Sequence, residues 1–259
     1  MSSIRKMMNP AIAIKDVYKS FGLTKVISGL DLKIDHGKIV GLIGPNGAGK
    51  TTLFNLISGL LSPTSGHILI NGKSIVGKKS FEIQRLGLSR SFQMTNIFSE
   101  LSVFENFRCA VLWRLGYRYG FWTFLSNLKE VNAEVYKYMS MVELDLKATM
   151  SAGKLSYAEQ RLLELGITFA SEASIILLDE PTSGLSQVEV IKFINLLRMN
   201  TTGKTVLIVE HDMNVIFDVV DEIVVMSEGK VIAFDVPSKV SSNPCVQDAY
   251  LGVSLKIGS

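Results

Sequence analysis

The chain has 259 residues, of which 47% are hydrophobic and 20% are charged, and its formal net charge is +3. This balance is typical of a folded globular protein and excludes a chain that is disordered along most of its length. The positive charge forms no basic run or stripe, so we expect no nucleic acid among the ligands.

The N-terminal segment and the cysteines give no sign of export. Arg5 and Lys6 are not followed by the apolar core that a secretory signal needs, and Pro10 interrupts the next residues. Cys109 and Cys245 stand in no paired spacing, which favours reduced cysteines over a disulfide framework or a thiolate metal site. We therefore expect a cytoplasmic protein.

Five segments follow one another in an order that predicts an α/β fold. Residues 38–43, 174–178 and 205–209 are apolar at consecutive positions, as is typical of parallel strands that are buried on both faces. Residues 51–61 and 189–199 have helical spacing and follow the first and the second of these strands. The order of strand, helix and strand indicates a mainly parallel sheet, whose strand order the sequence leaves open.

Two further segments predict an added antiparallel β portion. Residues 67–72 have the composition of a strand. Residues 222–234 contain two apolar runs separated by Glu228 and Gly229, which is the pattern of a hairpin turn.

Between about residue 95 and residue 170 the strand signals vanish and helical spacing dominates, as in residues 130–144. This pattern predicts a helical lobe inserted into the α/β core. We expect one domain, 1–259, with its core in 1–94 and 171–235, the lobe in 95–170 and a C-terminal tail in 236–259.

The first strand is followed directly by "GPNGAGKT", residues 44–51, which fits the phosphate-binding pattern G-x-x-x-x-G-K-[ST] between a strand and a helix. Backbone N–H groups of such a loop surround phosphate oxygens, Lys50 reaches the β and γ phosphates, and the Thr51 hydroxyl ligates Mg²⁺. The alternative is a glycine-rich turn that arose by chance. We predict a P-loop NTPase core in which a nucleoside triphosphate contacts Gly44, Pro45, Asn46, Gly47, Ala48, Gly49, Lys50, Thr51 and Thr52.

A second strand ends in two adjacent carboxylates, within "IILLDEP", residues 175–181. Placing carboxylates at the end of a buried strand costs free energy unless a cation or a reaction uses them. We assign Asp179 to Mg²⁺ and Glu180 to the water that attacks the γ-phosphate. The alternative is a solvated acidic turn.

His211 and Gln93 stand at two more predicted strand ends. A strand-end histidine taken alone is more often a turn residue than a ligand, and Gln93 carries even less information. Ligands nevertheless bind at the carboxyl edge of open α/β sheets, where Gly44, Asp179 and Glu180 also fall. We therefore predict catalytic roles for His211 and Gln93, and a place for Gln93 beside the metal.

Residues 155–160, "LSYAEQ", open a helical stretch. Ser156 and Glu159 have the S-x-x-E spacing of a capping box, in which each side chain accepts a hydrogen bond from a backbone N–H group at the helix start. A capped helix start still has a positive dipole end, so it is also a candidate anion site.

Taken in order, "GPNGAGKT", Gln93, "LSYAEQ", "IILLDEP", "SGLS" and His211 resemble the ATP-binding-cassette (ABC) ATPases along nearly the whole chain. The resemblance implies a head-to-tail dimer, of two like or unlike chains, in which Ser156 and Ala158 contact the ATP that the partner holds. It also implies that Phe21 stacks on adenine, with Tyr18 as the substitute.

Residues 87–107, 155–165 and 243–252 are similar to the ATP-binding subunits of branched-chain amino acid importers. This similarity implies membrane permease subunits as partners, a solute-binding protein as an indirect partner, and a peripheral place on the cytoplasmic face of the inner membrane. Two residues depart from the family pattern: Ala158 stands where the signature usually has glycine, and Ser186 where the next loop usually has Asp or Asn. They put the rate and the coupling in doubt more than the fold.

Three questions remain open at this level. The aromatic and basic segment 107–128 is too often interrupted by arginine to span a bilayer, and it is either an internal helix face or part of a docking surface. A soluble ABC-type clamp that acts in DNA repair or on the ribosome is the alternative function, although no long coiled coil and no second cassette are present. A P-loop kinase would not explain "LSYAEQ" or His211.

Overall fold

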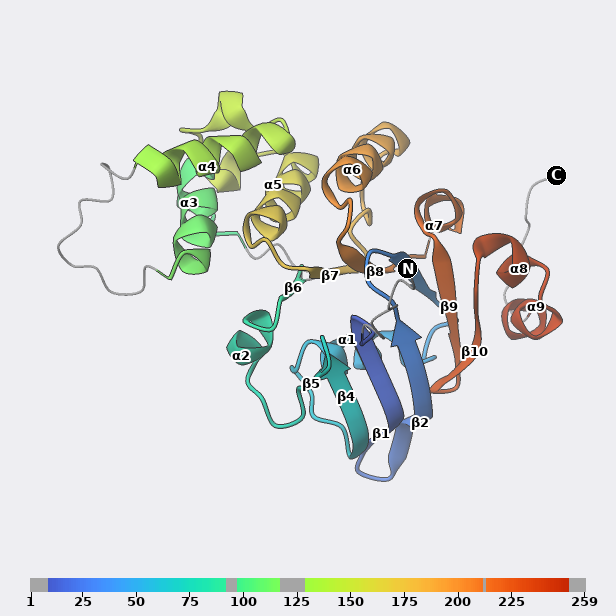
Figure 1. Ribbon diagram of the computed structural model, residues 1–259. Helices are drawn as coiled ribbons and strands as arrows, with labels where there is room; N and C mark the ends of the chain where they lie inside the picture. The colour runs from blue at the N-terminus through green and yellow to red at the C-terminus, as the bar shows by residue number, and fades with distance from the viewer. Residues whose placement is uncertain (1–8, 92–96, 117–128, 212, 252–259) are drawn as a thin grey trace, which may run out of the picture. The chain divides into compact units, whose positions relative to one another are not determined.

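The computed structural model describes residues 9–91, 97–116, 129–211 and 213–251 (Figure 1). The chain divides into two compact units by its contacts. Unit 1 comprises residues 1–88 and 203–259, and unit 2 comprises residues 89–202.

Unit 1 contains an antiparallel sheet with the strand order β2-β1-β4-β5, which Figure 1 shows in blue to teal. Its strands are β1 (Ile12–Phe21), β2 (Thr24–Ile34), β4 (Ser65–Ile70) and β5 (Lys73–Ser74). The strand predicted at 67–72 is confirmed as β4, whereas the sequence analysis missed β1 and β2. The pairing register shifts between Ile14 and Val17, around Asp16 with a φ of 47°, so a bulge interrupts the two-residue period that would have revealed β1.

A second group of strands in unit 1 has the order β10-β9-β3-β8. β3 (Ile39–Ile43) pairs in parallel with β8 (Thr205–Val209) and with β9 (Glu222–Ser227), and β10 (Lys230–Asp235) pairs antiparallel with β9. Every residue of β8 is buried, as expected for a parallel strand covered on both faces. The two predicted strands and the predicted hairpin are confirmed. Glu228 and Gly229 form the hairpin turn, with φ values of 49° and 74°.

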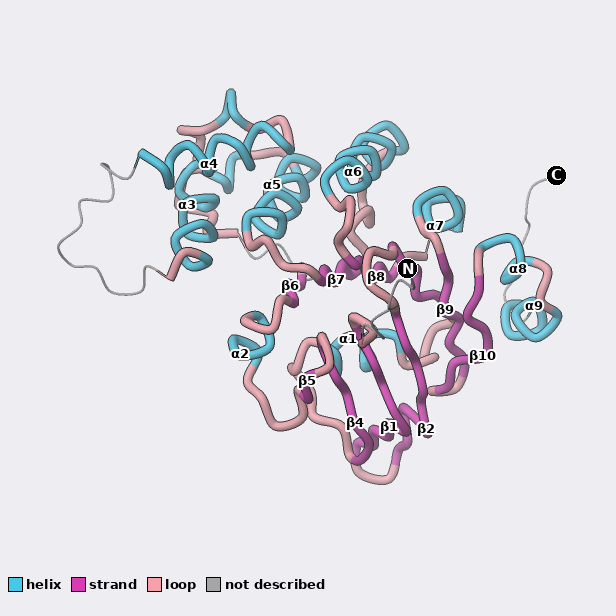
Figure 2. The backbone as a smooth tube through the Cα atoms, viewed as in Figure 1, coloured by secondary structure: helices cyan, strands magenta, loops and turns pink. Residues whose placement is uncertain are grey.

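Helices also lie near these strands in the described part of unit 1 (Figure 2). They are α1 (Lys50–Ile57), α2 (Ser80–Gln84), α7 (Met213–Val219), α8 (Pro237–Ser241) and α9 (Pro244–Leu251). α1 ends earlier than the predicted 51–61. The Ser58 hydroxyl donates to the Phe54 carbonyl at 2.9 Å and Gly59 has a φ of 72°, and a left-handed glycine just past a helix is a common stop.

Unit 2 is mostly helical and also contains β7 (Ile175–Asp179). Strand β6 (Leu88–Arg90) is the neighbour of β7 in the sheet, and just after β6 the Ser91 amide donates to the Leu177 carbonyl at 2.9 Å. The described residues of unit 2 form α3 (Val103–Arg114), α4 (Lys129–Met141), α5 (Tyr157–Ala170) and α6 (Gln187–Asn200), with short 3-10 turns at Asp145–Lys147 and Ala152–Lys154. The helical stretches predicted at 130–144 and 189–199 are confirmed as α4 and α6. The strand predicted at 174–178 is confirmed as β7.

Close helix packing forms the core of unit 2. Phe107 of α3 is fully buried against Gly166 of α5, where an added Cβ would lie 2.5 Å from Phe107 Cζ. A larger residue at Gly166 would therefore force α3 and α5 apart.

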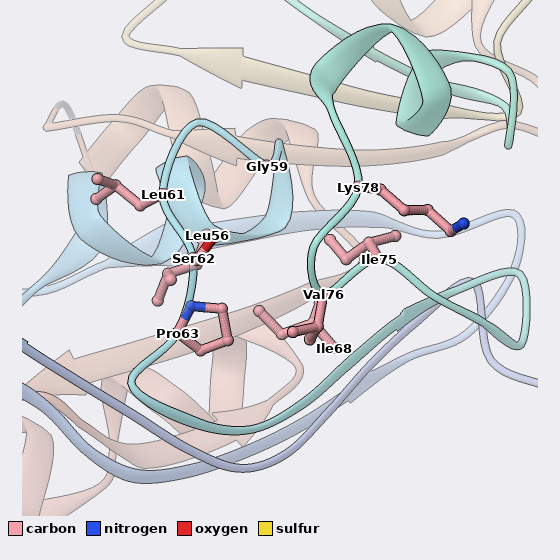
Figure 3. A pocket seen from close by; sticks show the side chains of 9 residues that line it. All are labelled: Leu56, Gly59, Leu61, Ser62, Pro63, Ile68, Ile75, Val76 and Lys78. Atoms are coloured by element: carbon pink, nitrogen blue, oxygen red, sulfur yellow. The ribbon is translucent and has the colours of Figure 1, made fainter.

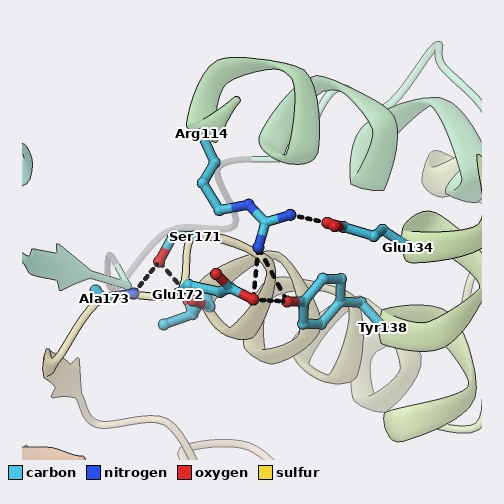
Figure 4. A network of polar contacts seen from close by, with 7 residues as sticks. Arg114, Glu134, Tyr138, Ser171, Glu172 and Ala173 are labelled. Carbon is cyan, nitrogen blue, oxygen red and sulfur yellow. Dashed lines mark hydrogen bonds and ion pairs between the residues drawn. The ribbon is translucent and has the colours of Figure 1, made fainter. Parts of the chain in front are cut away.

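A polar cluster at the end of α3 ties three parts of unit 2 together (Figure 4). Arg114 forms ion pairs with Glu134 of α4 and with Glu172, which follows α5. The Tyr138 hydroxyl donates to Glu172 at 2.7 Å, and burial followed by this contact raises the pKa of Tyr138 to about 12. Arg114 thus faces the inside of unit 2, in agreement with the internal alternative for this part of the segment 107–128. Trp113 is 51% exposed, and residues 117–128 lie outside the described part of the chain.

Candidate functional site

The loop that joins β3 to α1 has the backbone of a phosphate cradle. An added Cβ at Gly44 would lie 2.2 Å from the Met226 carbonyl oxygen, and one at Gly49 would lie 2.8 Å from Ile27 Cδ1. Gly49 also has a φ of 98°, so glycine is required there by both crowding and conformation. It is the N-cap of α1 and has no side chain to cap the helix start.

Lys50 directs its ammonium toward this loop. Lys50 Nζ donates to the Gly44 carbonyl at 2.6 Å and to the Pro45 carbonyl at 3.1 Å, and Lys50 is 7% exposed. A ring of backbone around an ammonium group at a helix start fits a polyphosphate anion, because charge and dipole both favour negative oxygens there. Thr51, the next residue, is exposed.

Two aromatic residues of β1 are candidates for contact with a base. Phe21 is 48% exposed at the end of the strand, and Lys19 Nζ lies 5.0 Å from the centre of its ring. Tyr18 is 38% exposed, but an added Cβ at Gly29 would lie 2.9 Å from the Tyr18 hydroxyl oxygen, so Tyr18 packs against β2. The nearby charge of Asp16 raises the pKa of Tyr18. Phe21 is the more exposed of the two rings.

His211 follows β8, as predicted, and is exposed. Its backbone N–H donates to Glu210 Oε2 at 3.3 Å, and Glu210 is 5% exposed. The sequence analysis did not single out Glu210. The signal was present, because this carboxylate directly follows a wholly buried strand.

In unit 2, Asp179 is the last residue of β7 and is 1% exposed. Arg90 Nη2 lies 3.0 Å from Asp179 Oδ2, and the Arg90 side chain is 8% exposed. Burial lowers the pKa of Arg90, and the neighbouring Asp179 charge opposes that shift. The sequence analysis missed Arg90 as the partner of this carboxylate, because 89 positions separate the two residues.

Glu180 lies in a different environment from Asp179. Its φ is 49°, in the left-handed region that costs free energy for any residue with a Cβ, and it is partly exposed. The Ser183 amide donates to the Glu180 carbonyl at 3.2 Å, which closes a turn directly after β7. The adjacent carboxylates are thereby separated into a buried residue in the strand and a partly exposed one in the turn.

Ser156 is the N-cap of α5 and forms the predicted capping box. Its hydroxyl accepts from the Glu159 amide at 3.3 Å, and its own amide donates to Glu159 Oε2 at 3.0 Å. Lys147 also donates to Glu159, and this contact is the main cause of the lowered pKa of Glu159. Ala158 lies in the first turn of the same helix and is partly buried.

Ser186, the second departure from the family pattern, forms a capping box at the start of α6. Its amide donates to Glu189 Oε2 at 2.8 Å and its hydroxyl donates to the same oxygen at 2.7 Å. These contacts lower the pKa of Glu189, with the hydroxyl contact as the larger cause.

Each unit therefore contains part of the predicted set. Unit 1 holds the P-loop, Phe21 and His211, and unit 2 holds Ser156, Ala158, Asp179 and Glu180. Gln93 lies outside the described residues. A small pocket of unit 1 contains none of the predicted residues (Figure 3); it is lined by Leu56, Gly59, Leu61, Ser62, Pro63, Ile68, Ile75, Val76 and Lys78. In the described parts of the chain, no helix is both long and apolar enough to cross a membrane.

The strand, cradle and helix of unit 1 are those of a P-loop nucleotide-binding protein. The sequence profile of the ABC transporter family matches residues 27–183. BraF, a high-affinity branched-chain amino acid transport ATP-binding protein of Pseudomonas aeruginosa, is 34% identical in an alignment of 253 residues that covers 95% of this chain and 99% of BraF. LivG of Escherichia coli, described in the same words, is 32% identical with the same coverage. RbsA of Bacillus licheniformis, a ribose import ATP-binding protein, is 32% identical over 85% of this chain and 44% of RbsA.

Solved structures are similar in fold and size. MJ1267, an ATP-binding cassette of an ABC transporter in its ADP conformation, has a TM-score of 0.80 at 26% identity and covers 93% of this chain and 98% of its own. A dimeric post-hydrolysis state of the cassette MJ0796, bound to ADP and Pi, has a TM-score of 0.74 at 25% identity, with 87% and 98% coverage. This chain belongs to the ABC transporter family, as an ATP-binding and ATP-hydrolysing subunit.

Proposed function

We propose that the chain supplies ATP-driven motion to an importer of branched-chain amino acids or a related solute. The observation that carries this proposal is the similarity to BraF and LivG, which extends over 95% of this chain and 99% of theirs. The similarity to RbsA spans 44% of that protein, so it supports a sugar substrate less well.

In the proposed mechanism the P-loop binds the phosphates through the backbone of residues 44–49 and through Lys50. The Lys50 ammonium exchanges its two carbonyl acceptors for phosphate oxygens, which are charged and therefore stronger acceptors. Phe21 stacks on the adenine, supported by its position at the exposed end of β1. Thr52 lies in the first turn of α1, beside Thr51.

Thr51 and Asp179 would hold Mg²⁺, with Gln93 as a further ligand. A divalent cation on the phosphates neutralises the charge that accumulates during transfer of the phosphoryl group. The chemistry of the donors supports this assignment, because Mg²⁺ prefers oxygen ligands and Asp179 supplies a carboxylate.

Glu180 polarises the attacking water, and His211 and Gln93 orient groups around the γ-phosphate. The left-handed backbone at Glu180 supports this role, because strain of this kind is concentrated at functional sites. A partly exposed carboxylate can accept a proton, whereas the ion-paired Asp179 is poorly placed to do so.

We also propose a head-to-tail dimer in which Ser156 and Ala158 at the start of α5 contact the nucleotide of the partner chain. The dimeric structure of MJ0796 supports an assembly of this kind. Permease subunits in the inner membrane receive the motion on the cytoplasmic side, and a solute-binding protein acts with them. The permeases and the binding protein then select the solute.

Uptake of labelled leucine by cells that express this chain together with its permease subunits tests the proposal. We expect leucine uptake to be lost when Glu180→Gln replaces the native chain. Unlabelled isoleucine and valine should inhibit uptake of labelled leucine, whereas ribose should not. Leucine uptake that persists without this chain, or competition by ribose alone, would contradict the proposed substrate class.

A further inference from the structure

Tyr157, the third residue of "LSYAEQ", connects the start of α5 to the turn that carries Glu180. Its hydroxyl oxygen accepts from Arg161 Nε at 3.1 Å and from Arg161 Nη2 at 2.7 Å. It donates to the Ser183 carbonyl at 3.1 Å. A phenol has one proton and two lone pairs, so these three hydrogen bonds use its full capacity.

The arginine that holds Tyr157 is itself fixed in the interior. Arg161 is 7% exposed, and its Nη1 lies 2.9 Å from Oε2 of Glu164, which is 9% exposed. The Arg161 guanidinium carbon also lies 5.1 Å from the centre of the Tyr157 ring. A planar guanidinium held by a buried carboxylate fixes the direction of its donors, so the position of the hydroxyl is set by α5.

The other side of the contact is a tight turn with little freedom. The Ser183 amide donates to the Glu180 carbonyl, and the Leu185 amide donates to the Thr182 carbonyl at 3.1 Å. Gly184 has a φ of 80°, and an added Cβ there would lie 3.1 Å from Tyr157 Cε1. The tyrosine ring and its hydroxyl therefore both contact the turn between β7 and α6.

We propose that Tyr157 is a positioning residue that couples the two nucleotides of the dimer through this turn. The inference rests on the proposed function, in which Ser156 meets the partner's ATP while Glu180 acts on the nucleotide of its own chain. When Ser156, next to Tyr157, engages the partner's phosphate, α5 and the Glu180 turn move together because Tyr157 joins them. Without the hydroxyl, α5 can close on ATP while the turn stays free.

The test uses Tyr157→Phe, which keeps the ring and removes only the hydrogen bonds. It is made in the full chain with Glu180→Gln, so that ATP is bound and not hydrolysed, and ATP-driven dimerisation is measured by analytical ultracentrifugation. Because the dimer must order the turn that the hydroxyl held, we expect the dimer dissociation constant to rise about tenfold. The affinity of the monomer for ATP with Mg²⁺ should stay unchanged.

Tyr136→Phe is the matched control, because Tyr136 on α4 is 50% exposed, against 46% for Tyr157. It should leave dimerisation unchanged. An unchanged dissociation constant for Tyr157→Phe, or an equal rise for both variants, would overturn the proposal.

A second measurement separates the tyrosine from the dimer itself. If the Glu180→Gln chain does not dimerise with ATP, the proposed head-to-tail dimer does not form from this chain by itself. Hydrogen exchange in the monomer still tests the contact between Tyr157 and the Glu180 turn. In the monomer, Tyr157→Phe should speed exchange of the Ser183 and Leu185 amides about tenfold while amides of β7 keep their protection. Equal exchange in both chains would refute the link between α5 and the turn.

Discussion

Replacing Arg90 with methionine should strongly destabilise unit 2. The change removes the cation next to Asp179, which is 1% exposed, and leaves a carboxylate buried without its ion pair. Breaking a buried pair from one side costs about 3–5 kcal/mol. The apolar part of methionine retains some of the packing of the arginine, so the loss comes mainly from the charge.

Urea unfolding followed by tryptophan fluorescence measures the loss of unfolding free energy in unit 2. The sequence contains two tryptophans, Trp113 and Trp122, and both fall within residues 89–202. The fluorescence transition of Arg90→Met should therefore shift to lower urea by an amount equivalent to about 3–5 kcal/mol.

The control combines Arg90→Met with Asp179→Asn, which keeps the shape of the carboxyl group and removes its charge. If the buried charge causes the loss, the double variant should be more stable than Arg90→Met alone by about 2 kcal/mol. A loss below about 1 kcal/mol for Arg90→Met, or a double variant less stable than the single one, would refute this reasoning.

Three further results follow from the site. Lys50→Ala should abolish productive ATP binding in calorimetry because the ammonium at the cradle is lost, and unchanged affinity with Mg²⁺ would remove Lys50 from the site. Glu180→Gln should still bind ATP but hydrolyse it about 10²–10⁴ times more slowly, and a variant with normal turnover would contradict its role as the base. The pKa of Glu159 is lowered in the folded chain, so folding favours the charged carboxylate. The stability that Glu159 contributes is therefore present above the pKa of the unfolded chain and is lost as the pH falls through the pKa of the folded chain. Lys147→Met should therefore reduce the fall in stability between neutral and acidic pH, and a pH dependence equal to that of the native chain would count against the contact.

Local patterns along the chain were sufficient to predict several strands, a hairpin and the start of one helix. The buried strands at 38–43 and 205–209 and the hairpin at Glu228 and Gly229 were predicted because consecutive apolar residues and a turn signal need no distant partner to be recognised. The capping box of Ser156 and Glu159 was predicted for the same reason, since both of its hydrogen bonds span three residues.

The tertiary structure decided the contacts between distant segments. The bulge around Asp16 interrupts the alternation of apolar and polar residues in β1, so the sequence pattern did not predict this strand. In the folded chain β1 pairs with β2 and with β4. Arg90 reaches Asp179 across 89 positions, and the Tyr157 hydroxyl reaches the Ser183 carbonyl across 26. The residues next to each partner in the sequence contain no pattern that predicts either contact. The free energy of such contacts comes from burial and geometry that exist only after the chain has folded. The sequence by itself thus predicted which residues bind a nucleotide, and the folded structure showed which distant residues contact Asp179 and the turn after it.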